Sequence, residues 1–141
     1  MARRLAGAAL ALSLMGASPV ASLDVAVEGL RSAKGQLRVC LTADPKNFPA
    51  CVDDARAVTR TVAAADRGLR LEGLAPGHYA IAVIHDANGN AKLDTFMGIP
   101  KEGFGFSRNP AIGFGPPKFT AAAFDLGADG GVQPVKMRYL L

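Results

Sequence analysis

Five residues at alternate positions of one polar stretch carry oxygen atoms that could bind a metal ion. They are Asp86, Asn88, Asn90, Lys92 and Asp94. Their spacing resembles positions one, three, five, seven and nine of an EF-hand-type calcium loop, in which position seven contributes only its main-chain carbonyl. Ca²⁺ takes about six to eight oxygen ligands, and Asp or Asn at every second residue can bring several of them to one point. The pattern therefore predicts a calcium site.

Two positions of this loop depart from the calcium-binding pattern. Ala91 stands at position six, where a glycine usually makes the turn, and Met97 stands at position twelve, where a bidentate glutamate is expected. With few carboxylates, the predicted Kd is weak, about 10⁻⁴–10⁻³ M. The alternative needs no metal, because Asn88-Gly89 is a favoured hairpin turn and Asx side chains bind their own main chain. The residues leave both interpretations open.

The two histidines form no complete catalytic arrangement with their neighbours in the sequence. An odd separation places His78 and His85 on opposite faces of one regular strand, which argues against a shared metal site. A weaker alternative is a hydrolase-like site in which His85, Asp86 and Glu102 converge. We therefore predict no catalytic residues, and we treat His85 and Glu102 as candidate binding residues.

Several phenylalanines follow the polar loop in segments rich in glycine and proline. They are Phe96, Phe104, Phe106, Phe114 and Phe119. One interpretation is a satellite hydrophobic cluster that pins a long irregular loop to the fold. The other is a recognition surface for a carbohydrate or a peptide, with exposed aromatic anchors that include Phe104 and Phe106.

The first residues have the three parts of a secretion signal. Arg3 and Arg4 precede an apolar stretch of alanine and leucine, and small residues up to Ser22 suit cleavage after that position. Removing residues 1–22 from 141 leaves 119 residues, which is enough for one domain, 23–141, and lowers the net charge from +4 to about +2. Because the basic residues are scattered, a nucleic-acid partner is not expected. The predicted location is periplasmic or secreted, with no membrane span after cleavage.

The two cysteines agree with an oxidising compartment. Cys40 and Cys51 are close in sequence, and a disulfide between them would stabilise the fold by about 3 kcal/mol. The alternatives are two free thiols or a weak metal pair. A redox-active pair is not expected, because the spacing is not C-x-x-C.

Alternation of apolar and polar residues with a period of two predicts strands along most of the chain. It covers residues 23–27, 36–42, 69–71, 78–85 and 132–141, and more weakly 56–64. Residues 119–126 could form a strand or a short helix. About seven short strands separated by turn signals predict an all-β fold, a single antiparallel β-sandwich.

Two long motifs carry a family resemblance. The run GLAPGHYAIAVIHDANGNAKLDTFMGIPKEGFGFSRN and the later GPPKFTAAAF resemble a domain-of-unknown-function family of secreted bacterial proteins, numbered 2141. Ala91 departs from the glycine usual in that family's loop. The resemblance implies a secreted β-sandwich, similar to transthyretin-like and carboxypeptidase-regulatory-like domains, and it implies no established activity.

These observations lead to a secreted, non-enzymatic β-sandwich protein with a structural or binding role. Weakly bound Ca²⁺ is the one cofactor expected, and it would order residues 86–94 and thereby position residues 98–107. The alternative is a carbohydrate- or peptide-recognition module that uses residues 86–107, with a glycan or a protein as partner.

Overall fold

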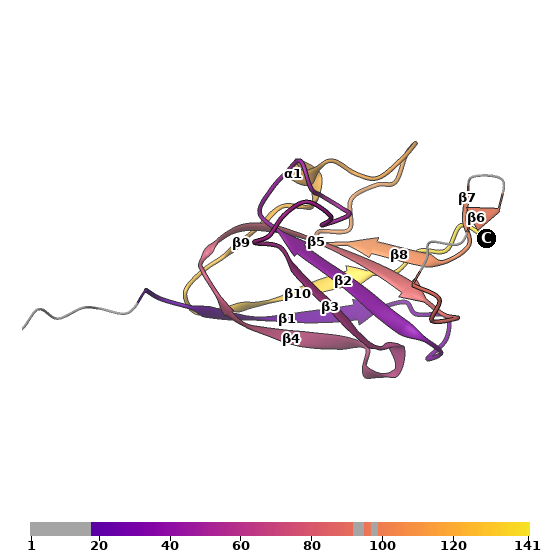
Figure 1. Ribbon diagram of the computed structural model, residues 1–141, viewed down its shortest axis with the longest axis horizontal. Coiled ribbons are helices and arrows are strands. Elements are labelled where there is room, and N and C mark those ends of the chain that lie inside the picture. Colours follow the sequence, from indigo (N-terminus) through magenta and orange to yellow (C-terminus); the bar gives the residue numbers. More distant parts are fainter. Residues whose placement is uncertain (1–17, 92–94, 97–98) are drawn as a thin grey trace, which may run out of the picture.

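The computed structural model describes residues 18–91, 95–96 and 99–141, which form two packed β-sheets (Figure 1). One sheet has the order β10-β1-β4. Its strands are β1 (Ala21–Glu28), β4 (Gly68–Leu74) and β10 (Gly131–Lys136). The other has the order β3-β2-β5-β8. Its strands are β2 (Gln36–Thr42), β3 (Val58–Ala63), β5 (Gly77–Asp86) and β8 (Gly103–Phe106). The predicted all-β sandwich is confirmed.

The minor elements lie at the margins of these sheets. They are η1 (Ala64–Asp66), β6 (Thr95–Phe96), β7 (Ile99–Pro100), α1 (Phe119–Ala122) and β9 (Phe124–Leu126). β6 pairs with β7, and β9 pairs with the start of β5. The segment 119–126 is thus a short helix followed by a short strand. No helix in the described part of the chain is long and apolar enough to cross a membrane.

The main core fills the space between the two sheets. In β1, buried residues alternate with partly exposed ones, so Leu23, Val25 and Val27 all point inward. In β5, Ile81 and Val83 point to the same core, whereas the intervening alanines face a second cluster on the outer side. Both faces of β5 are therefore covered, which explains its nearly continuous apolar sequence.

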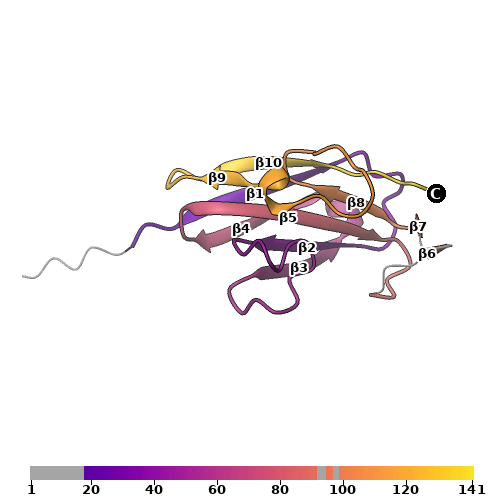
Figure 2. The same cartoon turned by 90° about the horizontal axis from the view of Figure 1, so that it is seen from above.

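The pairing is antiparallel except between β1 and β10, which run parallel. This places the C-terminal part of the chain beside β8, where Phe104 pairs with Arg138 and Ser107 with Val135. One side of the sandwich is therefore closed by contacts between the two sheets. β3 lies at the opposite margin (Figure 2).

One strand, β8 (Gly103–Phe106), consists of alternating glycine and phenylalanine and was not predicted from the sequence pattern. β8 turns Gly103 and Gly105 toward the C-terminal segment, and a Cβ on Gly105 would lie 2.7 Å from a methyl group of Val135. Glycine is thus required by close packing. Phe104 and Phe106 face the other way.

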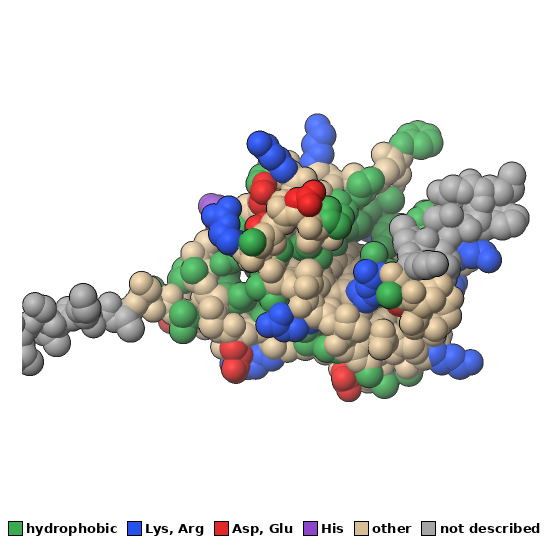
Figure 3. Space-filling view, in the orientation of Figure 1, with side chains coloured by type: hydrophobic (Ala, Val, Ile, Leu, Met, Phe, Trp, Pro, Cys, Tyr) green, Lys and Arg blue, Asp and Glu red, His purple; other side chains and the backbone are tan. Residues whose placement is uncertain are grey.

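A second cluster covers the outer face of β2 and β5. Phe106 packs there with Phe104, Phe48 and Phe119, close to the disulfide between Cys40 and Cys51, whose Cα atoms are 5.9 Å apart. Phe114 differs, because it is fully exposed between two paired glycines. Figure 3 shows hydrophobic side chains gathered on this face beside α1. Most of the described phenylalanines thus form a satellite hydrophobic cluster that packs the glycine- and proline-rich segments against the sandwich.

Candidate functional site

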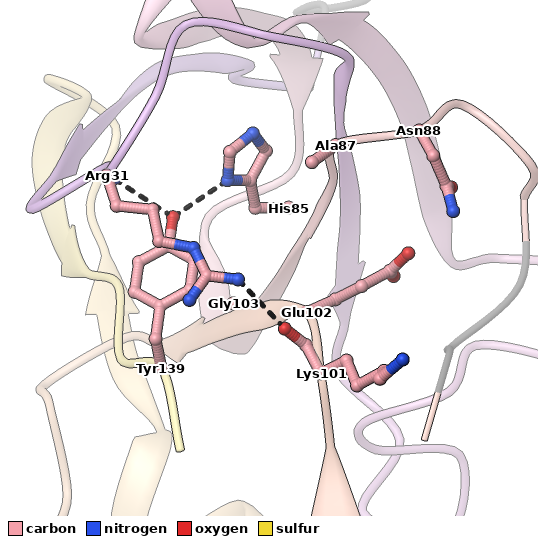
Figure 4. Close-up of a pocket in the computed structure, with 8 residues that line it drawn as sticks. All are labelled: Arg31, His85, Ala87, Asn88, Lys101, Glu102, Gly103 and Tyr139. Atoms are coloured by element: carbon pink, nitrogen blue, oxygen red, sulfur yellow. Dashed lines mark hydrogen bonds between the residues drawn. The ribbon is translucent and has the colours of Figure 1, made fainter. Parts of the chain in front are cut away.

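A polar pocket of about 390 Å³ opens at the end of β5, next to the polar loop. Its lining comes from four separate parts of the chain (Figure 4). The residues are Arg31, His85, Ala87, Asn88, Lys101, Glu102, Gly103 and Tyr139. Convergent polar groups in one concavity can fix the orientation of a small ligand.

His85 forms the inner wall of the pocket and is 1% exposed. Its Nε2 lies 2.7 Å from the main-chain oxygen of Lys34, which can only accept, so Nε2 carries the proton. Its Nδ1 lies 2.7 Å from Oη of Tyr139. The Arg31 main-chain N–H donates to that same Oη at 3.3 Å, so the hydroxyl can donate its own proton to Nδ1. Both ring nitrogens are therefore engaged within the protein.

Tyr139 is held between a glycine and an arginine. A Cβ on Gly103 would lie 2.4 Å from the ring, so only glycine allows this approach. The guanidinium of Arg31 lies 4.3 Å from the centre of the ring. It also donates to the main-chain oxygens of Leu141 at 2.6 Å and Lys101 at 3.0 Å. Arg31 and Tyr139 thus join the C-terminal segment to β8.

Charged and amide groups line the mouth of the pocket. The carboxylate of Glu102 points toward the space beside Asn88 and Lys101 (Figure 4). Glu102 is 6% exposed, whereas Asn88 and Lys101 are exposed. The pocket therefore presents a buried carboxyl group next to an accessible amino group.

The polar loop is organised by Asp86, which is fully buried. Its carboxylate accepts main-chain N–H bonds from Asn90 at 3.2 Å and from Ala91 at 2.7 Å. Asn88 Oδ1 accepts a further bond from Asn90 N at 3.2 Å. Ala91 has φ +58°, the left-handed conformation that position six of a calcium loop requires. The chain thus takes this conformation without glycine.

The structure brings together some of the residues selected from the sequence. His85, Asn88 and Glu102 line the same pocket. Phe104 and Phe106 lie on the opposite face of β8 and contribute to the second cluster. Lys92 and Asp94 lie outside the described residues. Among the residues that are described, no three His, Cys, Asp or Glu side chains gather as a metal site would need.

Sequence reasoning missed three residues of the pocket. Arg31 and Tyr139 belong to no motif and lie far from His85 in the sequence, and Lys101 lies within the 86–107 segment but was not selected as a site residue. The alternation of Gly103 and Gly105 was a usable signal, because glycine at every second position of a strand marks a close approach by another segment.

A family model described as "Uncharacterized protein conserved in bacteria (DUF2141)" matches residues 25–133. The chain belongs to this family. The DUF2141 match spans nearly the whole β-sandwich, including the polar loop and β8. No match was found among curated proteins or among solved structures.

Proposed function

We propose that this DUF2141 protein is an exported, non-enzymatic recognition module that binds a peptide-type ligand in the pocket beside the polar loop. The observation that carries the proposal is the convergence of Glu102, Lys101 and Asn88 at one concavity. A ligand with an ammonium group and a carboxylate or amide would complement these side chains.

Two features support export to the periplasm or the cell exterior. The first residues have the composition of a secretion signal. Cys40 and Cys51 are joined, and structural disulfides persist mainly in oxidising compartments.

The engagement of His85 favours binding over catalysis. A general base must reach a substrate proton with a ring nitrogen, but both nitrogens of His85 already bond to Tyr139 and Lys34. The buried ring holds the wall of the pocket in place.

The covering of Tyr139 favours a peptide over a sugar. Sugar recognition commonly uses an open aromatic face, and one face of this ring is covered by Arg31 while Gly103 packs against the ring at its closest approach. The carboxyl of Glu102 and the amino group of Lys101 instead suit the charged or amide groups of a peptide.

Ca²⁺ in the polar loop would stabilise the outer wall of this pocket. Asp86 and Asn88 begin the loop, Ala91 has the left-handed turn, and Asp94 supplies the second carboxylate in sequence. Because Asn88 belongs to both the loop and the pocket, a bound ion would also order the ligand site.

The recognition proposal is tested by NMR titration with a panel of tripeptides, on residues 19–141, which contain all of β1. Each peptide with free ends is compared with its acetylated and amidated form. We expect amide signals of residues 87–88 and 101–103 to shift with the free peptides and to shift less with the blocked ones. Glu102→Gln should weaken binding at least tenfold, whereas Glu72→Gln on exposed β4 should not.

If only neutral oligosaccharides gave saturating shifts, the ligand would be a sugar and not a peptide. No shift with any peptide at millimolar concentration would refute the recognition proposal.

The calcium proposal is tested by thermal melting in millimolar CaCl₂ and in EDTA. Ca²⁺ at tenfold excess over Kd should stabilise the folded state by about 1.4 kcal/mol. Asp86→Asn and Asp94→Asn should each abolish the increase in melting temperature. An equal melting temperature in both buffers would leave residues 86–94 as a metal-independent turn.

A further inference from the structure

A second polar hollow, of about 570 Å³, lies where β5 begins. β5 runs along most of the length of the sandwich, so this hollow and the pocket beside His85 lie at opposite ends of the molecule (Figure 2). Polar side chains of its lining come from β5, β9, β10, α1 and the turn after β8. They are His78, Arg108, Thr120, Asp125 and Gln133.

The turn after β8 is fixed by buried and main-chain hydrogen bonds. Ser107 is fully buried; its hydroxyl accepts the Ile81 N–H at 2.9 Å and donates to the Ala122 oxygen at 2.5 Å. Asn109 Oδ1 accepts the Lys136 N–H at 2.7 Å. These bonds hold Arg108 between two anchored neighbours.

Arg108 has an uncommon backbone conformation at this turn. Its φ is +62°, in the left-handed region that disfavours side chains with a Cβ. Its Nη1 donates to the Ala123 oxygen at 3.2 Å, which orients the guanidinium along the hollow. Backbone strain alone indicates no site, because Arg67 has φ +55° at the end of η1 and lines neither hollow. The fixed guanidinium distinguishes Arg108.

His78 and Asp125 are direct partners in the pairing of β5 with β9. Nδ1 of His78 contacts a carboxylate oxygen of Asp125. This contact orients the imidazole and engages one carboxylate oxygen of Asp125. The hollow then combines the Arg108 guanidinium with the hydroxyl of Thr120 and the amide of Gln133.

We propose that this hollow is an oxyanion-binding site, which takes a carboxylate or phosphate group through Arg108, with Thr120 and Gln133 as further donors. The guanidinium fork pairs with both oxyanions in a bidentate way, so the chemistry is shared by uronic acids and by phosphate esters. The site does not depend on the peptide pocket at the other end of β5.

The test is an NMR titration of residues 19–141 with D-galacturonate, with inorganic phosphate and with neutral D-galactose. We expect amide signals of residues 78, 108, 120, 125 and 133 to shift with at least one of the anions and not with galactose. A response to galacturonate alone identifies a carboxylate ligand, and a response to phosphate alone identifies a phosphoryl ligand.

Two matched variants separate binding from stability. Asparagine tolerates the left-handed region better than arginine, so Arg108→Asn and Arg67→Asn should both melt no lower than the wild type. Arg108→Asn should weaken anion binding at least tenfold, and Arg67→Asn should change it less than twofold. An equal loss of anion affinity in the two variants would show that net charge alone causes the loss, and it would overturn the proposed site. Unaltered anion binding in Arg108→Asn would overturn it too. Equal shifts with galactose, or no shift with either anion, would also overturn it.

Discussion

The two ends of β5 place the same residue type in opposite environments. His85 is 1% exposed, and its ring nitrogens contact Tyr139 and Lys34. The side chain of His78 is 77% exposed and contacts the carboxylate of Asp125. Sequence spacing assigns them to opposite faces of the strand, but it does not state how far along the strand other segments cover each face. The comparison shows that packing by distant segments decides whether a histidine is buried in a pocket wall or exposed to solvent.

Two glycine substitutions should give the largest difference between these ends. Gly103→Ala would place a Cβ 2.4 Å from the Tyr139 ring, so it should destabilise the protein by about 1–3 kcal/mol through overpacking. Gly77→Ala has its nearest atom at 3.8 Å and should change stability by less than about 0.5 kcal/mol. Urea unfolding measures both free energies. Equal effects would show that Tyr139 does not pack on β8 in solution.

Two tyrosine hydroxyls give the next difference. Tyr139→Phe removes the partner of buried His85 Nδ1 and should cost about 1–3 kcal/mol. Tyr79→Phe removes a hydrogen bond to the Ala75 oxygen at the exposed end and should cost less than about 1 kcal/mol. Thermal and urea unfolding of the two variants provide the measurement. A larger loss in Tyr79→Phe would contradict the contrast between the two ends.

The smallest effect concerns acid stability near the start of β5, where Thr42 pairs with Ala80. The Thr42 hydroxyl donates to Asp54 at 2.7 Å, and this bond, with the Arg56 N–H, lowers the pKa of Asp54 below its usual 3.8. Because the pKa is lower in the folded state, the stabilisation is present above about pH 4 and is lost as the pH falls through the folded pKa.

Asp54→Asn and Thr42→Val should therefore both flatten the decline of stability below about pH 4, measured by urea unfolding. A decline as steep as that of the wild type in both variants would assign the acid sensitivity to other carboxylates. The same measurement on Tyr139→Phe should retain the wild-type slope, since that hydroxyl does not contact Asp54.

Strand periodicity predicted most of the β-sandwich because one face of each strand meets the same core. It failed at β8, where the inward residues are Gly103 and Gly105 and therefore carry no apolar signal. The C-terminal pattern was partly confirmed: Val135 and Met137 are buried, but Leu141 is exposed beyond β10. β1 begins at Ala21, before the predicted cleavage site after Ser22, because Ala21 pairs with Leu74. A mature chain cut before Ala21 would retain this pairing.

The sequence by itself determined the family, the alternating strands, the proximity of the two cysteines and the polar spacing of residues 86–94. The last three features are local, since each depends on residues close together in the chain. Tertiary structure alone decided that Arg31 and Tyr139 line one pocket with His85, and that Arg108 lines another hollow with His78 and Asp125. The C-terminal segment lies beside β8 because β10 pairs with β1, whereas the pairing of β5 with β8 and β9 forms the second hollow. Sequence spacing cannot encode them, because contacts between distant segments depend on which strands become neighbours.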